Sequence, residues 1–545
     1  MMRVKKYTAC SIAAVFAAMF VSFAFIGCAE HVHTYADGEC TVCGQACEHS
    51  YSDGKCEICG QACEHDYFNR VCKICGQEKQ AHYDYVAHTS DVLPRISIDA
   101  VDPSDAGKLA TTEDRHFDLN DLESKNNRPY YSCKVSVGNC DDEYRLDGVT
   151  AEVKIRGNYT ANYPKKPFRI KFDKKQRMLG LNGGAACKSW VLLADYKDIA
   201  MTRNSLAFYL GKQILGSDDY YSTDFRPVEL YLNGNYWGMY LLAEQQQVNK
   251  YRVNVPEPDE GYTGTDIGYM LEYDGYYKFE AENERFTVDY DKNGMLTKRD
   301  GSQTWARGNI GFTVKNDVYA DEPDICAQTE FIKRYIQNIY DACYKAVYKQ
   351  EYYGFDEYFN LVRYTPTSED PVLETVSAMI EIRSLVDVYI INEIACDSDI
   401  SWSSFFMSAD MSESGDKLLR FEAPWDFDSA FGLKWECMNG TGLFAANSDN
   451  PWLIMFINED WFQDAIKEKW RELHDASVLK NAAEFIRSGR AHYADAYKDN
   501  FDKWGFVKSG ELNDTTMALN DHAAAVDHLY GWFETRIEYL DGLWL

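Results

Sequence analysis

The chain of 545 residues carries 56 basic and 86 acidic side chains, which gives a formal net charge of −30 at pH 7. This acidity argues against nucleic-acid binding as the main function, because phosphate backbones are bound by clustered lysine and arginine. The length allows a large core and more than one domain. An anionic ligand would need a local basic site.

Residues 1–28 have the pattern of an export signal. A positive region containing Lys5 and Lys6 precedes the apolar stretch 9–26, and the segment ends in a box that resembles a bacterial lipoprotein cleavage site with Cys28 as the lipidated residue. We expect an exported chain that is anchored through Cys28 at the outer face of the cell membrane. A plain signal peptide or an uncleaved anchor is the alternative. No second run of about 18 apolar residues follows.

Residues 29–80 contain three repeats with a period of 16 residues. In each repeat a His-x-Tyr precedes Cys-x-x-Cys-Gly-Gln, and a Cys-x-His follows the first two knuckles. A Cys-x-x-Cys-Gly knuckle turns two thiolates toward one tetrahedral ion, and the following Cys-x-His can complete the set. The expected zinc ligands are Cys40, Cys43, Cys47 and His49, then Cys56, Cys59, Cys63 and His65, then Cys72 and Cys75 with His82 or an upstream histidine.

Disulfide bonding is the alternative chemistry for these cysteines, because an exported chain can meet an oxidising environment. Either chemistry makes the segment a small stapled module, which would serve as a stalk or as an adaptor for a partner. Residues 81–94 are polar and predict a linker. The main domain would then span 95–545, with its motifs in 150–432 and a helical part over 450–545.

The segment from Lys154 to Arg177 carries nine lysine or arginine residues and one acidic residue, Asp173. Apolar residues alternate with cations over 168–172, which on a strand sends the cations to one face. A cationic strand beside the glycine-containing turn at 156–158 suits a polyphosphate, and a solvated edge strand is the alternative. The candidate phosphate ligands are Arg156, Lys166, Arg169 and Lys171.

The next segments predict a buried strand at 189–196, a helix at 201–215 and a hairpin at 228–243. Asn233-Gly234 is a strong signal for the two-residue turn of that hairpin. Glu244 at its end would either pair with a phosphate-binding lysine or be a surface carboxylate. Further helical patterns are expected at 325–349, 460–474, 479–497 and 514–540.

The stretch 390–432 carries the strongest chemical signal. A helix at 384–396 should lead into a loop with Asp397 and Asp399. Strands at 404–408 and 417–423 should then return the chain, so that two further carboxylates, Asp426 and Asp428, emerge beside the first pair.

Clustered carboxylates of this kind repel one another unless a hard cation or a shared proton offsets the repulsion. The pattern therefore predicts a magnesium or manganese site with one carboxylate free for acid–base work. The alternative is that the first pair caps the helix and the second lies in a solvated loop.

The motif PWDFDSAFG at 424–432 resembles the signature of the CotH family of secreted, spore-coat-type kinases, which have an atypical protein-kinase-like fold. Three other stretches, at 156–172, 192–210 and 228–245, are similar to family motifs and occur in the family's order. The resemblance implies an α+β chain with a kinase-like fold and a helical C-terminal lobe.

The resemblance also implies transfer of phosphate from ATP, bound with magnesium or manganese, to a serine of an exported protein. Asp399 would be the general base, Asp426 the metal ligand and Asp428 a second ligand. Family members carry asparagine five residues after the base, where this chain has Ser404, a weaker and shorter ligand. A surface pseudokinase or scaffold that binds nucleotide without turnover, and a metal-dependent hydrolase, are therefore the alternatives.

Overall fold

The computed structural model describes residues 93–109, 128–320, 326–435, 438–508 and 510–545, together with short pieces of the repeat region between 35 and 77. The chain divides into two compact units, Met1–Gln80 and Ala81–Leu545. Within the described residues, no helix is both long and apolar enough to cross a bilayer. Several predictions concern side chains outside the described residues, namely Cys28, Cys40, Cys43, Cys47, His49, His65 and His82.

The period of 16 residues in the first unit corresponds to short antiparallel hairpins. Each hairpin pairs a tyrosine with the first cysteine of the following knuckle, as in Tyr51 with Cys56 and Tyr67 with Cys72. The strands are β1 (Tyr35–Ala36), β2 (Glu39–Cys40), β3 (Tyr51–Ser52), β4 (Lys55–Cys56), β5 (Tyr67–Phe68) and β6 (Val71–Cys72).

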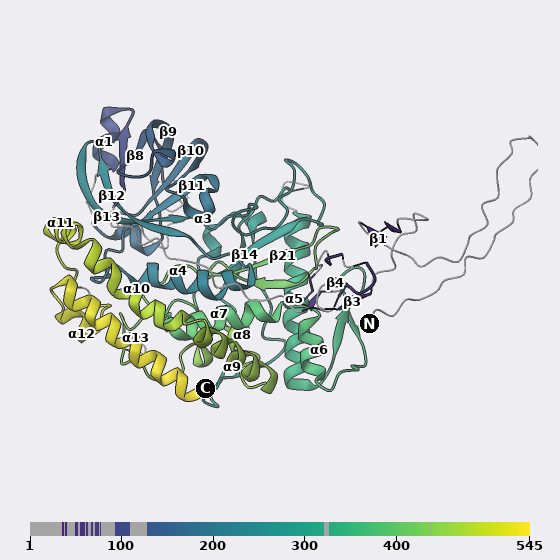
Figure 1. The fold of residues 1–545 in the computed structure, drawn as a ribbon. Helices are drawn as coiled ribbons and strands as arrows, with labels where there is room; N and C mark the ends of the chain where they lie inside the picture. The colour runs from purple at the N-terminus through teal and green to yellow at the C-terminus, as the bar shows by residue number, and fades with distance from the viewer. Residues whose placement is uncertain are drawn as a thin grey trace, which may run out of the picture. The chain divides into compact units, whose positions relative to one another are not determined.

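The second unit begins with a closed barrel, drawn in blue tones in Figure 1. Its strand order is β10-β11-β13-β12-β7-β8-β9, and only β12 and β7 run parallel. The strands are β7 (Arg95–Ala100), β8 (Tyr131–Gly138), β9 (Leu146–Ile155), β10 (Phe168–Arg177), β11 (Ala186–Leu193), β12 (Phe225–Leu232) and β13 (Asn235–Glu244). Two short helices, α1 (Pro103–Leu109) and α3 (Leu181–Gly184), accompany it.

The alternation expected for the cationic strand is confirmed in β10. Phe168, Ile170 and Phe172 are buried in the barrel core, whereas Lys171 is exposed. The turn at Asn233-Gly234 has φ values of 50° and 76°, the left-handed region that this hairpin turn requires, and it joins β12 to β13 as expected.

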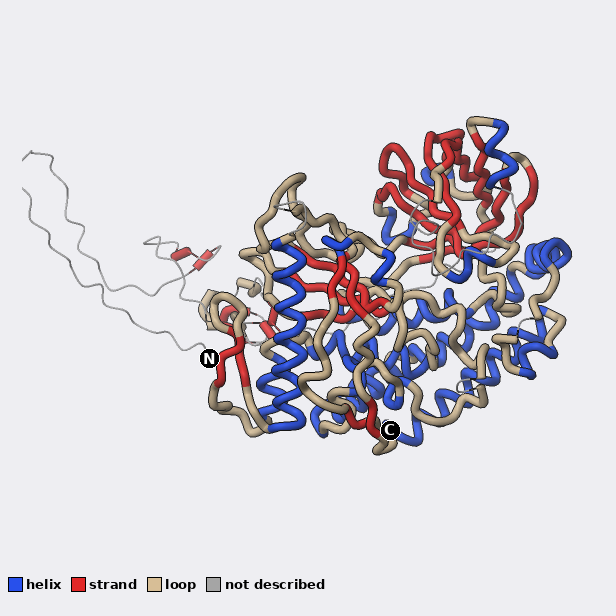
Figure 2. Tube along the Cα trace, turned by 180° about the vertical axis from the view of Figure 1, so that it is seen from behind, coloured by secondary structure: helices blue, strands red, loops and turns tan. Residues whose placement is uncertain are grey.

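A second, open sheet lies beside the barrel, in the order β15-β18-β14-β21-β22. The pairing of β21 with β22 confirms the hairpin expected before Asp426. Figure 2 shows the long helix α5 (Ala327–Lys349) standing against this sheet. The strands are β14 (Gly268–Asp274), β15 (Arg285–Phe286), β18 (Gly311–Val314), β21 (Phe405–Asp410) and β22 (Leu419–Phe421). Two small pairs stand apart from it, β16 (Leu296–Thr297) with β17 (Gln303–Thr304) and β19 (Tyr353–Phe355) with β20 (Leu361–Arg363).

The C-terminal region is helical, as expected, and α10 packs against both α4 and α13 (Figure 1). The expected helix at 479–497 is interrupted at Tyr493, and the expected helix at 514–540 is divided because Asp521 caps a new helix through the amide of Ala524. The remaining helices are α4 (Arg203–Ile214), α6 (Pro371–Ser377), α7 (Ile382–Ala395), α8 (Pro451–Ile454), α9 (Asp460–Asp475), α10 (Val478–His492), α11 (Ala494–Trp504), α12 (Asp514–Ala518) and α13 (His522–Trp544).

The α+β class and the helical C-terminal part are thus confirmed. The closed barrel of seven strands differs from the amino-terminal lobe of an ordinary protein kinase.

Candidate active site

A cavity of about 840 Å³ opens where the barrel meets the second sheet. Cations gather on one wall, and carboxylates gather on the other with Lys197, Lys315 and Lys434 beside them. Cations of the barrel side form one wall, and carboxylates from β14 and from the loops around β21 and β22 form the other. The cationic wall consists of Arg128, Lys154, Arg156 and Arg169. The acidic wall consists of Glu272, Asp274, Glu280, Asp399, Asp426 and Asp428.

Strands β9 and β10 position the cationic wall. Lys154 and Arg169 are direct partners in the antiparallel register, so their side chains leave the same face of the barrel. Burial lowers the pKa of Arg156, and burial together with the charge of Arg156 lowers the pKa of Arg128 to about 10. A bound anion would relieve this crowding of partly desolvated cations.

Of the four residues expected to bind phosphate, Arg156 and Arg169 line the cavity. Lys166 and Lys171 are not among its lining residues. Lys166 is buried and its Nζ donates to the carbonyl of Ala161 at 3.0 Å, whereas Lys171 points to solvent from the outer side of the barrel.

Glu244 also takes a different position from the one expected. It is buried at the end of β13, where its Oε1 lies 3.1 Å from Nε of Arg252. Its partner is therefore an arginine of the following loop and not a lysine of the cationic wall, and Glu244 is not among the residues that line the cavity.

Helix α7 delivers the first pair of aspartates. The side chain of Glu381 caps its start by accepting from the amide of Ser384 at 2.7 Å. The helix ends at Ala395 and is capped by Cys396, whose φ of 49° is in the left-handed region. The chain then turns, and Asp397 and Asp399 follow in the loop.

The two aspartates of this loop have different surroundings. Asp397 is buried and accepts from the amide of Asp399 at 3.1 Å, and burial together with the charge of Asp399 raises its pKa well above the usual range. Asp399 lines the cavity, with Nζ of Lys434 3.7 Å from its Oδ1. Asp397 thus shapes the turn, and Asp399 presents a carboxylate to the cavity.

Asp426 faces the same cavity from the other side of the β21–β22 hairpin. Its φ of 71° is in the left-handed region, which aspartate adopts more readily than most residues. The hydroxyl of Ser404 donates to its Oδ2 at 3.4 Å. Burial, with the charges of Asp428 and Asp399, raises the pKa of Asp426 to about 7. A cation at this position would offset the repulsion.

Asp428 already has a cationic partner. Its Oδ1 lies 3.1 Å from Nζ of Lys197, which also donates to the hydroxyl of Ser429 at 2.7 Å. Burial alone would lower the pKa of Lys197, but the carboxylates of Asp428 and Asp399 and the hydroxyl of Tyr163 together outweigh burial and hold that pKa well above its usual range.

Glu272 is a member of the acidic wall that the sequence reasoning missed. Its Oε1 accepts from the amide of Ser404 at 3.1 Å, and its Oε2 lies 3.0 Å from Nζ of Lys315. Ser404 therefore bridges two carboxylates, with its amide toward Glu272 and its hydroxyl toward Asp426. The only sequence signal was a pair of acidic residues, Glu272 and Asp274, within the otherwise apolar strand β14.

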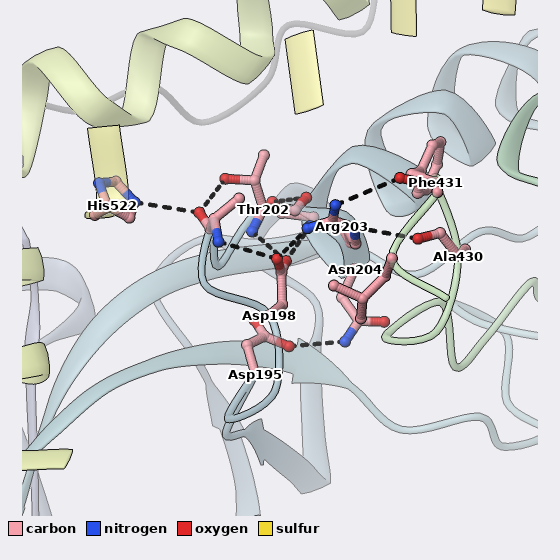
Figure 3. A network of polar contacts seen from close by, with 12 residues as sticks. Asp195, Asp198, Thr202, Arg203, Asn204, Ala430, Phe431 and His522 are labelled. Carbon is pink, nitrogen blue, oxygen red and sulfur yellow. Dashed lines mark hydrogen bonds and ion pairs between the residues drawn. The ribbon is translucent and has the colours of Figure 1, made fainter. Parts of the chain in front are cut away.

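A buried polar network lies at the start of α4 (Figure 3). The carboxylate of Asp198 accepts from the amides of Thr202 and Arg203, each at 2.9 Å, and pairs with the guanidinium of Arg203. Asp198 thus caps the first turn of the helix and fixes the arginine at the same time.

The same turn holds the segment that carries the second pair of aspartates. Nε of Arg203 donates to the carbonyl of Ala430 at 3.1 Å, and its Nη2 donates to that of Phe431 at 3.4 Å (Figure 3). Oδ1 of Asn204 accepts from the amide of Phe427 at 2.9 Å. Arg203 and Asn204 are therefore positioning residues for the acidic wall.

His522 joins this network from α13 (Figure 3). Its Nε2 lies 3.2 Å from the carbonyl oxygen of Ala200, and its ring stacks on Tyr497 with 3.7 Å between centroids. Burial lowers the pKa of His522 to about 4. The folded protein therefore holds a neutral imidazole over a pH range where the unfolded chain binds a proton.

The pKa of His522 predicts a pH dependence of stability. An unfolded histidine titrates near pH ~6.5, so the stabilisation is complete above that pH and is lost as the pH falls toward about 4. Denaturant unfolding should show wild type losing on the order of 2 kcal/mol more than a His522→Phe variant between about pH 7 and pH 4. Equal losses would assign the acid sensitivity to other groups.

The family comparison agrees with this geometry. A family model described as CotH kinase protein matches residues 153–540, which is well over half of the chain and includes Arg156, Asp399 and Asp426. No curated protein matched the chain. The match includes the end of β9, all of β10, the hairpin beside the carboxylates and most of the helical region. On this basis the chain belongs to the CotH kinase protein family.

Proposed function

We propose that this chain transfers the γ-phosphoryl group of a nucleoside triphosphate to a hydroxyl group. The observation that carries the proposal is the two-walled cavity, in which cations of the barrel face the carboxylates of Asp399 and Asp426. Phosphoryl transfer depends on positioning and on neutralising charge, and both kinds of group are needed at one place.

The cavity suits a nucleotide in size and lining. Its volume of about 840 Å³ lies within the range typical of small-molecule sites, roughly 300–1,000 Å³. Arg156 and Arg169 would bind the phosphates, with Arg128 and Lys154 beside them. The aromatic side chains of Trp402 and Trp435 also line the cavity and offer flat surfaces for a base.

The donor set of the acidic wall fits a magnesium or manganese ion. Hard divalent cations prefer oxygen ligands, and the carboxylates of Asp426 and Glu272 lie on either side of Ser404. The raised pKa of Asp426 reflects its burial and the neighbouring negative charges, which such an ion would balance. We propose that Glu272, on exchanging its contact with Lys315 for the ion, supplies a carboxylate where Ser404 is a poorer ligand than asparagine. The ion would neutralise phosphate charge as the bond to the leaving group breaks.

Asp399 is the proposed general base. It would accept the proton of the acceptor hydroxyl as that oxygen forms a bond to the γ-phosphorus and the bond from phosphorus to the bridging oxygen breaks, which releases the nucleoside diphosphate. Lys434, close to Asp399, would bind the transferred phosphoryl group. Asp428 would hold Lys197 in place and would contribute less to the ion than the sequence suggested.

The acceptor and the location are proposals from sequence alone. The signal-like segment 1–28 supports export and a lipid anchor at Cys28. An enzyme placed there would meet exported proteins, so a serine of such a protein is the proposed acceptor.

The direct test is incubation of the full-length mature chain with γ-labelled ATP and magnesium or manganese. Label on the chain itself or on a serine-rich peptide, stable to boiling in detergent, is expected. Free labelled phosphate without labelled protein or peptide would support a hydrolase. Nucleotide binding without either product would support a pseudokinase, for which Ser404 is the structural argument.

A further inference from the structure

Three cysteine sulfurs in the repeat unit lie together. The Sγ atoms of Cys63, Cys72 and Cys75 are all within 4.8 Å of one another, and those of Cys63 and Cys72 are 3.7 Å apart. Cys63 and Cys72 are buried, with 7% and 2% of their surfaces exposed. This cluster is separate from the two-walled cavity, which lies in the other unit.

The spacing of the sulfurs matches metal ligands better than a disulfide. Zinc–sulfur bonds of about 2.3 Å in tetrahedral geometry place two sulfurs about 3.8 Å apart. A disulfide requires about 2.05 Å. Three cysteines also cannot all be paired with one another, whereas three thiolates and one further ligand are a common zinc set.

The cluster joins residues that the sequence had assigned to different sites. Cys63 was expected to act with Cys56 and Cys59, the knuckle before it, but its sulfur lies with those of the knuckle after it. The site therefore spans two repeats.

The second and third knuckles have one backbone hydrogen bond in common. The amide of Cys56 donates to the carbonyl of Gln61 at 2.9 Å, and that of Cys72 donates to the carbonyl of Gln77 at 2.9 Å. In the sequence, the residue that follows the third knuckle at the place equivalent to Cys63 is Lys79, which is not a zinc ligand. Sites formed within single repeats therefore lack the equivalent cysteine at the third knuckle and would need a histidine such as His82 in its place.

If each knuckle instead binds its ion together with the residue that precedes it, all three knuckles have a further potential ligand. Nine residues before the first cysteine of each knuckle the sequence has His31, Cys47 and Cys63, all of which can bind zinc. Two positions after each of these three residues the sequence has a histidine, namely His33, His49 and His65.

We propose that Cys63, Cys72 and Cys75 bind one zinc ion and that this ion connects the second repeat to the third. The three thiols would lose their protons to solvent on binding. The sequence offers His65 for the remaining position. By the same register, an ion held by Cys47, Cys56 and Cys59 would join the first repeat to the second, so the repeats form a linked series and not separate knuckles.

The test uses the zinc content of the full-length mature chain after dialysis against a weak chelator. The comparison is between two double variants, Cys63→Ser/Cys75→Ser and Cys59→Ser/Cys63→Ser. Under the proposed register Cys63 and Cys75 belong to one site. The double variant Cys63→Ser/Cys75→Ser should therefore lose one zinc ion per chain, the same number as Cys63→Ser or Cys75→Ser alone. Cys59 and Cys63 belong to two different sites, so the double variant Cys59→Ser/Cys63→Ser should lose two zinc ions per chain. Cobalt substitution gives a second readout, because tetrahedral thiolate coordination of cobalt produces an intense visible absorption. This absorption should decrease in proportion to the number of metal ions that each variant loses.

Within-repeat sites would give the reverse result, with one zinc lost from Cys59→Ser/Cys63→Ser and two from Cys63→Ser/Cys75→Ser, and would overturn the proposal. It would also fail if the chain held no zinc and mass analysis after alkylation showed these cysteines oxidised to disulfides. A His65→Ala variant that keeps all its zinc but shows a changed cobalt spectrum would support the fourth ligand. None of these readouts depends on phosphoryl transfer, so they are independent of the proposed enzyme activity.

Discussion

Replacing Asp426 with asparagine is expected to reduce phosphoryl transfer by about a thousandfold or more, equivalent to about 4 kcal/mol of transition-state stabilisation. Asparagine has nearly the same shape but cannot offset the charge of a divalent ion, so metal-dependent nucleotide binding should weaken as well.

Asp399→Asn should lower the transfer rate by about 10²–10⁴-fold while nucleotide binding is retained, because a general base acts on the acceptor. Both are measured with labelled ATP and with nucleotide titration.

Asp173→Asn is the matched control for these variants. Asp173 is an exposed carboxylate on β10 outside the cavity lining, so its replacement should leave both measurements unchanged. Glu272→Gln should raise the metal concentration for half-maximal transfer by about tenfold if Glu272 supports the ion. Full activity of Asp426→Asn would refute the metal-ligand role, and full activity of Asp399→Asn would refute the base.

The second large effect concerns the folding of the helical region. Arg536 on α13 is fully buried, and its Nη2 lies 2.6 Å from Oε1 of Glu393 on α7. Arg536→Met should lower the free energy of unfolding by about 3–5 kcal/mol, because it leaves a buried carboxylate without its cation. Denaturant unfolding followed by circular dichroism measures this loss.

An exposed ion pair in the same region provides the comparison. Nη1 of Arg490 lies 2.8 Å from Oδ1 of Asp527, and 41% and 55% of the two side chains are exposed. Arg490→Met should therefore lower the free energy of unfolding by less than about 1 kcal/mol. Adding Glu393→Gln to Arg536→Met should recover part of the lost stability, because the unpaired charge is removed. If Arg490→Met and Arg536→Met destabilised equally, burial would not be the cause.

The acidic stretch was predictable because its geometry is local. A helix that ends at Ala395 and a hairpin formed by β21 and β22 are both encoded by short patterns, and together they bring Asp399 and Asp426 to one cavity. Alternation along β10 likewise placed Arg169 on the cationic face.

Contacts between distant segments could not be read in the same way. Glu272 reaches Ser404 only because β14 pairs with β21, and 132 residues separate the two. Lys166 lies in the turn before β10, where strand alternation does not apply, and its side chain points inward. The partner of Glu244 depends on the path of the loop that carries Arg252.

The closed barrel has a consequence for how an acceptor can be recognised. Peptide-binding sheets commonly lengthen by one strand, which requires a free edge whose amides and carbonyls are unpaired. The barrel beside the cavity has no such edge, because its seven strands pair in a ring. Under the proposed function, an acceptor on this side would therefore be held by its side chains and surface shape. A serine on a folded protein or a small hydroxyl compound meets that requirement as well as an extended peptide does.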